Sequence, residues 1–348
     1  MDREQRPGGI WLILAILALI WGSSFILMKR GLFHEGVPVL TSWQVATARL
    51  SIAWLALSPI LLRHIRLFPK HWLPLLGTGM LGNGVPAFLY ATAQTRIDSA
   101  LSGMLNGLTP LMTLLTGLLF FGTRARGVHL IGIILGLIGA AGLIAFNSKD
   151  GLPSWSAYAV LSIIGTIGYG FSGNIVKKYL YMLPPRATSA LALTWVGPVS
   201  IGLALGSGLP ETLRTDPHAW SALGHVAVLA VFSSALALVL WNVLLQRTSA
   251  LNASTVTYLM PVVAIGWGLM DGETVGWQQM MMIGLVLGGV YLVSVAERVR
   301  GEAEREAAQG RGISFGITER NSGIPRDPAS PLLCRKEPNF APCTWDRK

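Results

Sequence analysis

Ten stretches of about twenty apolar residues dominate the sequence, and a short polar segment divides them into two groups of five. A helix of about 20 residues crosses the hydrocarbon core of a bilayer, which is about 30 Å thick. Because each group crosses an odd number of times, the second group enters the membrane in the opposite direction to the first. The sequence therefore predicts an all-α membrane protein with ten transmembrane helices, arranged as two inverted five-helix repeats. The predicted spans are 10–29, 39–62, 72–94, 99–121, 128–146, 155–176, 188–206, 220–245, 250–270 and 276–296.

The composition agrees with a membrane location. Of the 348 residues, 52% are hydrophobic and only 13% are charged, and the mean hydropathy is +0.53. So little polar surface does not cover a soluble globule of this length. The apolar runs are continuous and do not alternate with polar residues, which favours helices over a membrane β-barrel.

The distribution of basic residues predicts the orientation of the chain. The net charge is +10, but the Lys and Arg residues do not gather on one helix, so nucleic acid is not an expected partner. The segments on the side of the amino terminus carry eleven Lys and Arg residues, and those on the opposite side carry five. Cytoplasmic loops carry such an excess. We therefore expect a multi-pass protein of the bacterial inner (plasma) membrane with both termini in the cytoplasm.

The same pattern divides the chain into five segments. These are a cytoplasmic N-terminus (1–9), a first repeat (10–146), a linker (147–154), a second repeat (155–296) and a cytoplasmic tail (297–348). The tail mixes charged residues with Gly and Pro and has little to bury, so we expect it to be disordered. Both cysteines, Cys334 and Cys343, lie in the tail, so no disulfide or metal framework is expected in the core.

An internal repeat with an offset of about 150 residues links the two halves. The segment Ser99–Pro110 is followed by two spaced glycines, and a similar segment, Ser249–Pro261, is followed by two more. Chance similarity between apolar sequences is the alternative explanation. The glycine pairs have the four-residue spacing that lets helices approach closely, which predicts that the fifth and tenth spans are scaffold. These pairs are Gly132 with Gly136, and Gly284 with Gly288.

Several short motifs occur in the order and spacing of a known family. They are Ile20–Phe25 (IWGSSF), Ala48–Leu50, Ser99–Leu101, Leu108–Leu111 and Phe120–Gly122 in the first half, and Leu259–Pro261 and Gly272–Thr274 in the second. Over residues 10–296 the chain resembles the EamA-type ten-helix members of the drug/metabolite transporter (DMT) superfamily. The resemblance implies two EamA-like repeats. It also implies secondary transport of small metabolites, such as amino acids, by alternating access, and the implied direction is export. One departure is Thr123, which stands where the family has an acidic residue, whereas Glu273 keeps that residue in the second half.

Two prolines interrupt spans at equivalent places in the two halves. Pro110 and Pro261 each remove a backbone hydrogen bond, which frees the carbonyl groups of Asn106 and Thr257. Such breaks either line a ligand cavity or serve only as packing kinks. Their matched positions favour the cavity.

Polar and aromatic residues near mid-span add further candidates for a substrate cavity. Buried amides and hydroxyls in a membrane either bond between helices or face a wet cavity. The aromatic rings are suited to stacking on a planar substrate or on an ammonium group. Besides the two prolines, the candidates are Trp21, Ser24, Asn83, Tyr90, Asn106, Thr109, Tyr169, Asn174, Trp241, Asn242, Thr257 and Tyr258.

Arg49 is the strongest single candidate. It lies about ten residues into the second span, where a charge costs a few kcal/mol and normally faces the interior of the bundle. It either binds a carboxylate of the substrate or holds backbone carbonyl groups. Lys29, at the edge of the first span, is expected to extend its ammonium group to the interface.

Other classes of site are missing from the sequence. There is no Gly-x-x-x-x-Gly-Lys-Ser/Thr segment for nucleotides, and the six histidines lack a metal-ligand spacing, so we expect no cofactor, no metal and no catalytic site. No two carboxylates share the interior of a span, so a coupling ion, such as a proton, has no clear carrier; Asp98, Asp271 and Glu273 lie at span ends. The favoured hypothesis is a transporter with a small-molecule substrate. The alternatives are a membrane-embedded enzyme acting on lipid-linked substrates and a non-transporting membrane scaffold.

Overall fold

The computed structural model describes residues 7–123, 127–146, 157–247, 253 and 255–296. The chain divides into two compact units, residues 1–298 and 299–348, and every described residue belongs to the first unit. The predicted linker and tail lie outside the described residues, as do the first six residues of the predicted cytoplasmic N-terminus.

The first half of the described unit is helical apart from one small hairpin. Its elements are α1 (Pro7–Leu32), β1 (Phe33–His34), β2 (Val37–Pro38), α2 (Ser42–His64), η1 (Ile65–Leu67), α3 (Phe68–Gly79), η2 (Met80–Gly84), α4 (Val85–Ala93), α5 (Ser99–Asn106), α6 (Thr109–Phe120) and α7 (Gly127–Ala145). Strands β1 and β2 pair antiparallel, with Phe33 opposite Pro38. Glu35 and Gly36 both have positive φ in the two-residue turn, which is the turn geometry that joins short antiparallel strands tightly.

The second half is built from helical segments. They are α8 (Ala157–Tyr179), α9 (Pro185–Leu193), α10 (Gly197–Gly206), α11 (Leu209–Thr215), α12 (Ala219–Val228), η3 (Leu229–Leu236), α13 (Ala237–Arg247), η4 (Thr255–Tyr258), α15 (Met260–Met270) and a last helix, Trp277–Ala296.

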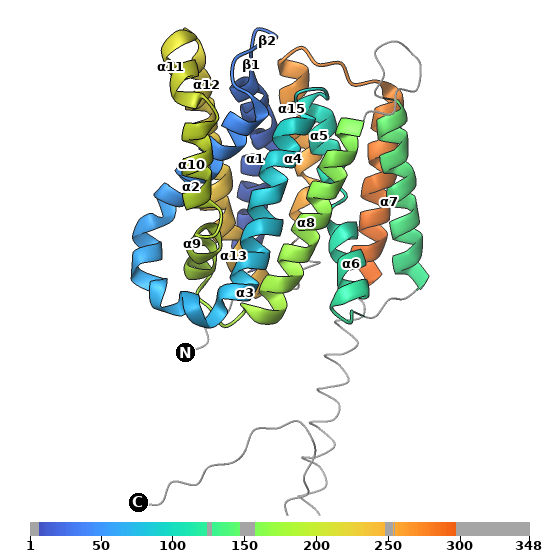
Figure 1. The fold of residues 1–348 in the computed structure, drawn as a ribbon. Coiled ribbons are helices and arrows are strands. Elements are labelled where there is room, and N and C mark those ends of the chain that lie inside the picture. The colour runs from blue at the N-terminus through green and yellow to red at the C-terminus, as the bar shows by residue number, and fades with distance from the viewer. Residues whose placement is uncertain (1–6, 124–126, 147–156, 248–252, 254, 297–348) are drawn as a thin grey trace, which may run out of the picture. The chain divides into compact units, whose positions relative to one another are not determined.

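The helices account for the predicted spans. Among the described residues, eight helical segments are long and apolar enough to cross a membrane. One of them, Ser42–Ala93, is 52 residues long and contains the second and third predicted spans, which run as a helical hairpin (Figure 1). The ninth predicted span corresponds to the shorter apolar helix Val256–Met270. The prediction of an all-α membrane protein is confirmed.

The two halves run in opposite directions. In Figure 1, α1 rises from the N-terminal end of the bundle to the β1–β2 hairpin at the top. The equivalent helix of the second half, α8, starts at the top and descends to the lower end. We refer to the end of the bundle that carries β1 and β2 as the hairpin end. The opposed directions of α1 and α8 are those expected of inverted repeats.

Matched breaks interrupt the helices of both halves. The fourth span breaks between α5 and α6, and the ninth between η4 and α15, with Pro110 and Pro261 in the first turn of the following helix. A proline is tolerated there because the amide groups of the first turn have no partner within the helix. The third and eighth spans contain the π-helical segments η2 and η3, about 150 residues apart, which the sequence analysis did not predict. Such segments occur often at functional sites.

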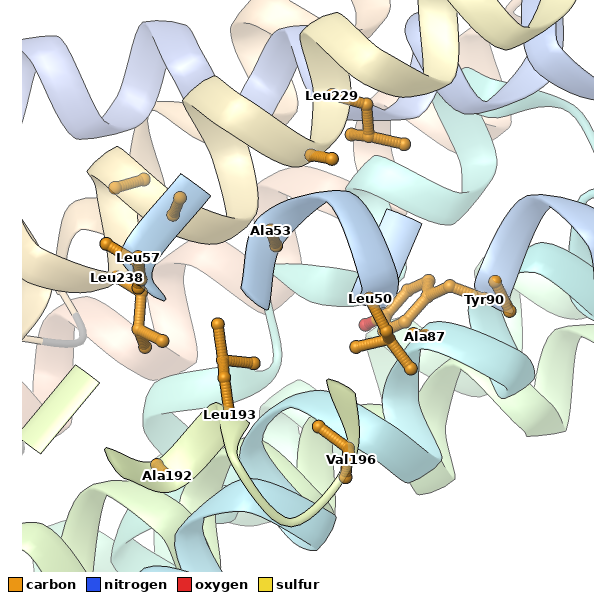
Figure 2. Packing of buried hydrophobic residues seen from close by; sticks show 14 of the residues in the cluster. Leu50, Ala53, Leu57, Ala87, Tyr90, Ala192, Leu193, Val196, Leu229 and Leu238 are labelled. Atoms are coloured by element: carbon orange, nitrogen blue, oxygen red, sulfur yellow. The ribbon is translucent and has the colours of Figure 1, made fainter. Parts of the chain in front are cut away.

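Two clusters of buried apolar side chains hold the helices together. The larger cluster joins α2 to α9, α12 and α13, and Figure 2 shows Leu50 and Leu57 of α2 among Leu193, Val196 and Leu238. The smaller cluster joins α5, α6 and α7 to the last helix. The outer face of α7, in contrast, exposes Ile131, Ile134 and Ile138 at a helical spacing, as a surface in contact with lipid does.

Close glycine contacts occur between α7 and the last helix, and they involve the predicted glycines of α7 but not those of the last helix. A Cβ atom at Gly132 would lie 2.6 Å from the carbonyl oxygen of Gly289. The prediction was wrong for Gly284 and Gly288, where an added Cβ would meet no atom within 4 Å. Gly289, one position further along the helix, faces α7 instead, because neighbouring positions on a helix point about 100° apart.

Candidate functional site

A small cavity of about 100 Å³ lies inside the described unit, between the two halves. Its walls come from α1, α2, α4, α5, α6, α8, α13 and α15, and from the irregular segments η2, η3 and η4. The lining residues are Trp21, Ser24, Phe25, Met28, Arg49, Asn83, Tyr90, Asn106, Thr109, Tyr169, Ser172, Ser233, Ser234, Leu238, Trp241, Thr257 and Met260. We call this space the central cavity.

The central cavity brings together ten of the fifteen predicted site residues. They are Trp21, Ser24, Arg49, Asn83, Tyr90, Asn106, Thr109, Tyr169, Trp241 and Thr257. The helix breaks explain part of this agreement, because Asn106 and Thr257 are the residues whose carbonyl groups lie four positions before the two prolines. Pro110 and Pro261 themselves are buried but do not line the cavity.

Two predicted residues bond between helices and do not line the cavity. The Asn174 amide of α8 donates to the carbonyl oxygen of Thr113 and to the hydroxyl of Thr116, both on α6, at 2.8 and 3.1 Å. The Asn242 amide of α13 donates to the hydroxyl of Ser189 on α9 at 2.9 Å. The alternative reading, in which buried amides hold helices together, therefore applies to both.

Tyr258 also lies outside the cavity lining. Its hydroxyl lies 2.7 Å from the hydroxyl of Ser294 on the last helix, so it ties η4 to the scaffold. The sequence alone does not distinguish Tyr258 from Thr257, because the two residues are neighbours in the same predicted span. Only the direction of each side chain from the helix separates a cavity residue from a scaffold residue.

Seven lining residues were not predicted. They are Phe25, Met28, Ser172, Ser233, Ser234, Leu238 and Met260. Sequence signals were available for Ser233 and Ser172: Ser233 lies 150 positions after Asn83 and Ser172 lies 148 positions after Ser24, so each occupies the equivalent place in the second repeat. The others are apolar residues or single serines, which are common throughout the membrane helices.

Two pairs of aromatic rings shape the cavity walls. The rings of Trp21 and Trp241 meet edge to face, with centroids 5.4 Å apart, and join α1 to α13. The rings of Tyr90 and Tyr169 are nearly parallel, with an interplanar angle of 15° and centroids 5.9 Å apart, and join α4 to α8. These rings bring the two halves into contact and present flat apolar surfaces to the cavity.

Most polar groups of the central cavity bond to one another. The hydroxyl of Tyr90 donates to Oδ1 of Asn106 at 2.8 Å, and the indole N–H of Trp21 donates to the carbonyl oxygen of Ser233 at 3.0 Å. Thr109 donates to the freed carbonyl oxygen of Asn106 at 2.7 Å. Such internal bonds fix the positions of the walls, because buried polar groups without partners are costly.

Arg49 enters the cavity from α2. Its Nε donates to the hydroxyl of Ser234 on η3 at 2.7 Å. The lining residues include no Asp or Glu, and among the residues that the structure describes no carboxylate forms an ion pair with Arg49. The guanidinium group is therefore the one formally charged group in the described lining of the cavity.

A wider vestibule of about 720 Å³ lies at the hairpin end and shares no lining residue with the central cavity. Its walls include Lys29, Arg96 and Asp271, and the stacked rings of His34 and His218, whose centroids are 3.9 Å apart. The carboxylate of Glu273 lies close by, buried between helices. We call Lys29, Arg30, Asp271 and Glu273 the hairpin-end ion cluster.

The hairpin-end ion cluster joins helices from both halves. The Lys29 ammonium group lies 2.7 Å from Oδ2 of Asp271 and 2.7 Å from Oε1 of Glu273. Glu273 also accepts hydrogen bonds from the backbone N–H groups of Ser99 and Ala100, at the start of α5, at 3.0 and 2.9 Å. Lys29 therefore has specific partners, which goes beyond the expected extension to the interface.

The two carboxyl groups of the cluster are held in their ionised form. Burial raises the pKa of Glu273, but hydrogen bonds from Lys29, Ala100 and Ser99 outweigh it, so the pKa lies below its ordinary value. The pKa of Asp271 is also lowered, because the bonds from Lys29 and Arg30 outweigh burial. Both groups remain charged at neutral pH, so neither is ready to accept a proton there.

The described residues contain no group of three His, Cys, Asp or Glu side chains that could hold a metal ion. What the geometry provides is a cavity at membrane depth, between two inverted bundles, with polar and aromatic walls. Such an arrangement binds a small molecule and passes it between the two sides of a membrane. The fold and the cavity define a membrane transporter.

The chain belongs to the EamA-like transporter family, whose model matches residues 8–145 and 156–295, one match for each half. It is 28% identical over 290 residues to the uncharacterized inner membrane transporter YedA of Escherichia coli strain K12, covering 81% of this chain and 89% of that one. An uncharacterized transporter of Archaeoglobus fulgidus is 23% identical, with 81% and 98% covered. The uncharacterized transporter YyaM of Bacillus subtilis is 22% identical, with 83% and 95% covered. A solved crystal structure that is 17% identical shares the fold, with a TM-score of 0.57 over 84% of this chain and 99% of that chain. The protein is therefore a transporter of the DMT superfamily and not an enzyme.

Proposed function

We propose that this protein is a secondary transporter that exports small metabolites, such as amino acids or related compounds, across the inner membrane by alternating access. The observation that carries the proposal is the position of the central cavity. It lies where the broken fourth and ninth spans and the π-helical segments of the third and eighth spans meet. In inverted-repeat transporters the substrate site is formed at such a meeting of discontinuous helices.

The size of the central cavity supports a mechanism in which the two halves of the protein move relative to each other. Pockets for small organic ligands usually measure about 300–1,000 Å³, whereas this cavity measures about 100 Å³. A metabolite therefore needs the two halves to separate before it enters. The hairpin-end ion cluster ties α1 to α5 and to the segment after α15, so opening at that end requires these bonds to break.

The orientation and the membrane are part of the proposal. The excess of Lys and Arg on the side of the amino terminus supports cytoplasmic termini, and the name of the E. coli relative supports an inner membrane. With this orientation, the hairpin end and its vestibule face away from the cytoplasm. The repeats comprise residues 10–146 and 155–296, and the tail 297–348 is cytoplasmic. The export direction rests on the resemblance to the family alone.

Flux into proteoliposomes that contain only the full-length chain tests the transport claim. We expect uptake of at least one class of metabolite from a broad panel, and reduced uptake by Trp21→Ala, which removes a cavity wall. Trp220→Ala is the matched control, because Trp220 is exposed at 65% and lies outside the cavity lining. Uptake by neither the wild type nor the control, across the panel, would contradict the proposal.

Cysteine labelling tests alternating access. Both native cysteines lie in the tail, so Cys334→Ser with Cys343→Ser gives a cysteine-free background. In this background, Ser172→Cys reports on the central cavity and Ser221→Cys on the vestibule. We expect a membrane-impermeant maleimide to label Ser172→Cys from either side, and Ser221→Cys from the side opposite to the cytoplasm only. Labelling of Ser172→Cys from one side alone, with or without substrate, would argue against the mechanism.

A further inference from the structure

The guanidinium group of Arg49 is only partly bonded inside the central cavity. Its Nε donates to Ser234, and no residue in the described part of the chain bonds to its two terminal nitrogens. These nitrogens are also not among the fully enclosed polar atoms without a partner, so they reach open space. Since Arg49 lines the central cavity, that open space is the cavity itself.

A counter-charge stabilises a charge in this position. The cost of a cation at membrane depth falls when it pairs with an anion. Asp271 and Glu273 are paired with Lys29 and Arg30 at the hairpin end, so they are not partners of Arg49. The described lining of the cavity contains no acidic residue. An anionic partner for Arg49 therefore has to come from outside the described residues.

The geometry of the free nitrogens matches a carboxylate. A guanidinium group that donates through Nε to one acceptor keeps a pair of parallel N–H groups for two oxygens of an anion. Ser234 fixes the plane of the group, because its hydroxyl accepts from Nε at 2.7 Å. Tyr90 and Asn106, by contrast, already bond to each other through the tyrosine hydroxyl and Oδ1 of the amide.

The walls beside Arg49 suit an apolar body attached to that carboxylate. Arg49 lines the cavity together with Tyr90 and Tyr169, whose rings are nearly parallel. Trp21 and Trp241 form the second aromatic pair in the lining. Aromatic faces alone would also attract a cation, but the fixed positive charge of Arg49 opposes one in the same small space.

Building on the transport function proposed above, we propose that Arg49 selects the substrate: the transported compound carries a carboxylate that binds the terminal nitrogens of Arg49, and its apolar part lies against the aromatic walls. Compounds whose only charged group is an amine are excluded. The inference names the class of cargo and the residue that distinguishes it. It also assigns Ser234 as the positioning residue that orients the guanidinium group.

Matched probes test the proposal on the purified full-length protein. The probes are 3-phenylpropionate and phenylalanine, each compared with its amide, together with phenethylamine. Binding is followed by quenching of tryptophan fluorescence, and flux is followed in proteoliposomes. We expect binding of at least one carboxylate and at least about 10-fold weaker binding of its amide and of the amine, since a hydrogen bond to a charged group contributes about 1.5–3 kcal/mol.

Variants of Arg49 sharpen the test. Arg49→Gln should weaken carboxylate binding by about 10- to 100-fold and remove the discrimination against the amide. Arg49→Lys should keep the preference for the carboxylate with lower affinity, because a lysine keeps the charge but not the paired N–H groups. Ser234→Ala should raise KM several-fold and keep the preference. Arg63→Gln is the matched control, since Arg63 lies on the same helix but is exposed.

The outcomes separate this inference from the transport proposal. Flux of the amides or the amine at the rate of the carboxylates would overturn the role of Arg49 and leave transport intact. Carboxylate binding that depends on Arg49, without flux, would support the selectivity and count against transport. Binding of no carboxylate probe by a folded wild-type protein, or carboxylate binding unchanged in a folded Arg49→Gln variant, would overturn the inference.

Discussion

Lys29 and Glu273 form an ion pair across 244 positions of sequence, with Nζ and Oε1 2.7 Å apart. The glutamate side chain is 3% exposed, and it accepts further hydrogen bonds from Ser99 and Ala100 at the start of α5. A carboxylate at the start of a helix is also stabilised by the helix dipole. One carboxylate thus connects α1, α5 and the segment after α15 at the hairpin end.

Replacing this carboxylate should destabilise the protein. In Glu273→Gln the ion pair with Lys29 is lost, and the amide nitrogen faces N–H groups that need an acceptor. Removing one partner of a buried pair costs about 3–5 kcal/mol, and the 27% exposure of Lys29 reduces this to about 2 kcal/mol. Thermal unfolding in detergent measures the effect. The matched control is Glu211→Gln, at an exposed position of α11, which should lower the melting temperature much less than Glu273→Gln does.

The same group predicts a dependence of stability on pH. The pKa of Glu273 in the folded protein lies below its ordinary value of 4.5, so the unfolded chain binds this proton more readily. The stabilisation is therefore complete above pH 4.5 and is lost as the pH falls through the lower, folded-state value. Melting temperatures measured from pH 7 down to pH values well below 4.5 should fall more for the wild type than for Glu273→Gln. Parallel curves for the two proteins would contradict the assignment.

The opposite end of the bundle lacks this carboxylate. Gly122 and Gly272 both have positive φ and end equivalent helices, and each is followed by a residue whose N–H bonds back to the helix. The residue after Gly272 is Glu273, but the residue after Gly122 is Thr123, whose side chain carries no charge. The two ends of the inverted repeat are therefore held by different bonds, and Thr123 is the residue at which the sequence departs from the family pattern.

Glycine contacts between α7 and the last helix give a test within a single helix. An added Cβ at Gly289 would lie 2.5 Å from the carbonyl oxygen of Gly132, whereas at Gly288 it would meet nothing within 4 Å. Gly289→Ala should therefore cost about 1–3 kcal/mol of stability through overpacking. Gly288→Ala should be neutral or slightly stabilising, because alanine favours helices over glycine by about 1 kcal/mol. Equal melting temperatures for the two variants would show that α7 does not approach the last helix as described.

The architecture was predictable because it depends on features that repeat along the chain. Apolar runs of about twenty residues define spans whatever their detailed packing, and an odd number of spans per half fixes the inversion. Pro110 and Pro261 could be matched because they occupy equivalent positions in the two repeats, and a proline in the middle of a span removes a backbone hydrogen bond. Arg49 could be placed in the interior because a charged side chain at this depth of a membrane span normally faces the inside of the helix bundle.

The finer parts of the site depend on information that one sequence does not contain. Asn106 lines the cavity while Asn174 bonds to α6, and the two amides look alike until the rotation of each helix is known. The π-helical segments η2 and η3 add a residue to a turn, so they shift which side chains face inward. The partners of Lys29 lie more than two hundred residues away in the sequence, and no local sequence pattern predicts them.

The hydrogen bond between Tyr90 and Asn106 supports a last prediction about the cavity wall. The Tyr90 hydroxyl, on a side chain that is 2% exposed, donates to Oδ1 of Asn106 at 2.8 Å, and the remaining contact of that oxygen with Thr109 is 3.4 Å long. Tyr90→Phe therefore leaves a buried acceptor poorly satisfied, at a cost of about 1–2 kcal/mol. Because Asn106 then loses its fixed position in the cavity, we expect a several-fold higher KM for transport. Tyr179→Phe is the control, since Tyr179 is 51% exposed and lies outside the cavity lining. An unchanged KM and melting temperature in Tyr90→Phe would mean that this bond does not shape the site, whereas equal losses in both variants would point to a general effect of removing a tyrosine hydroxyl.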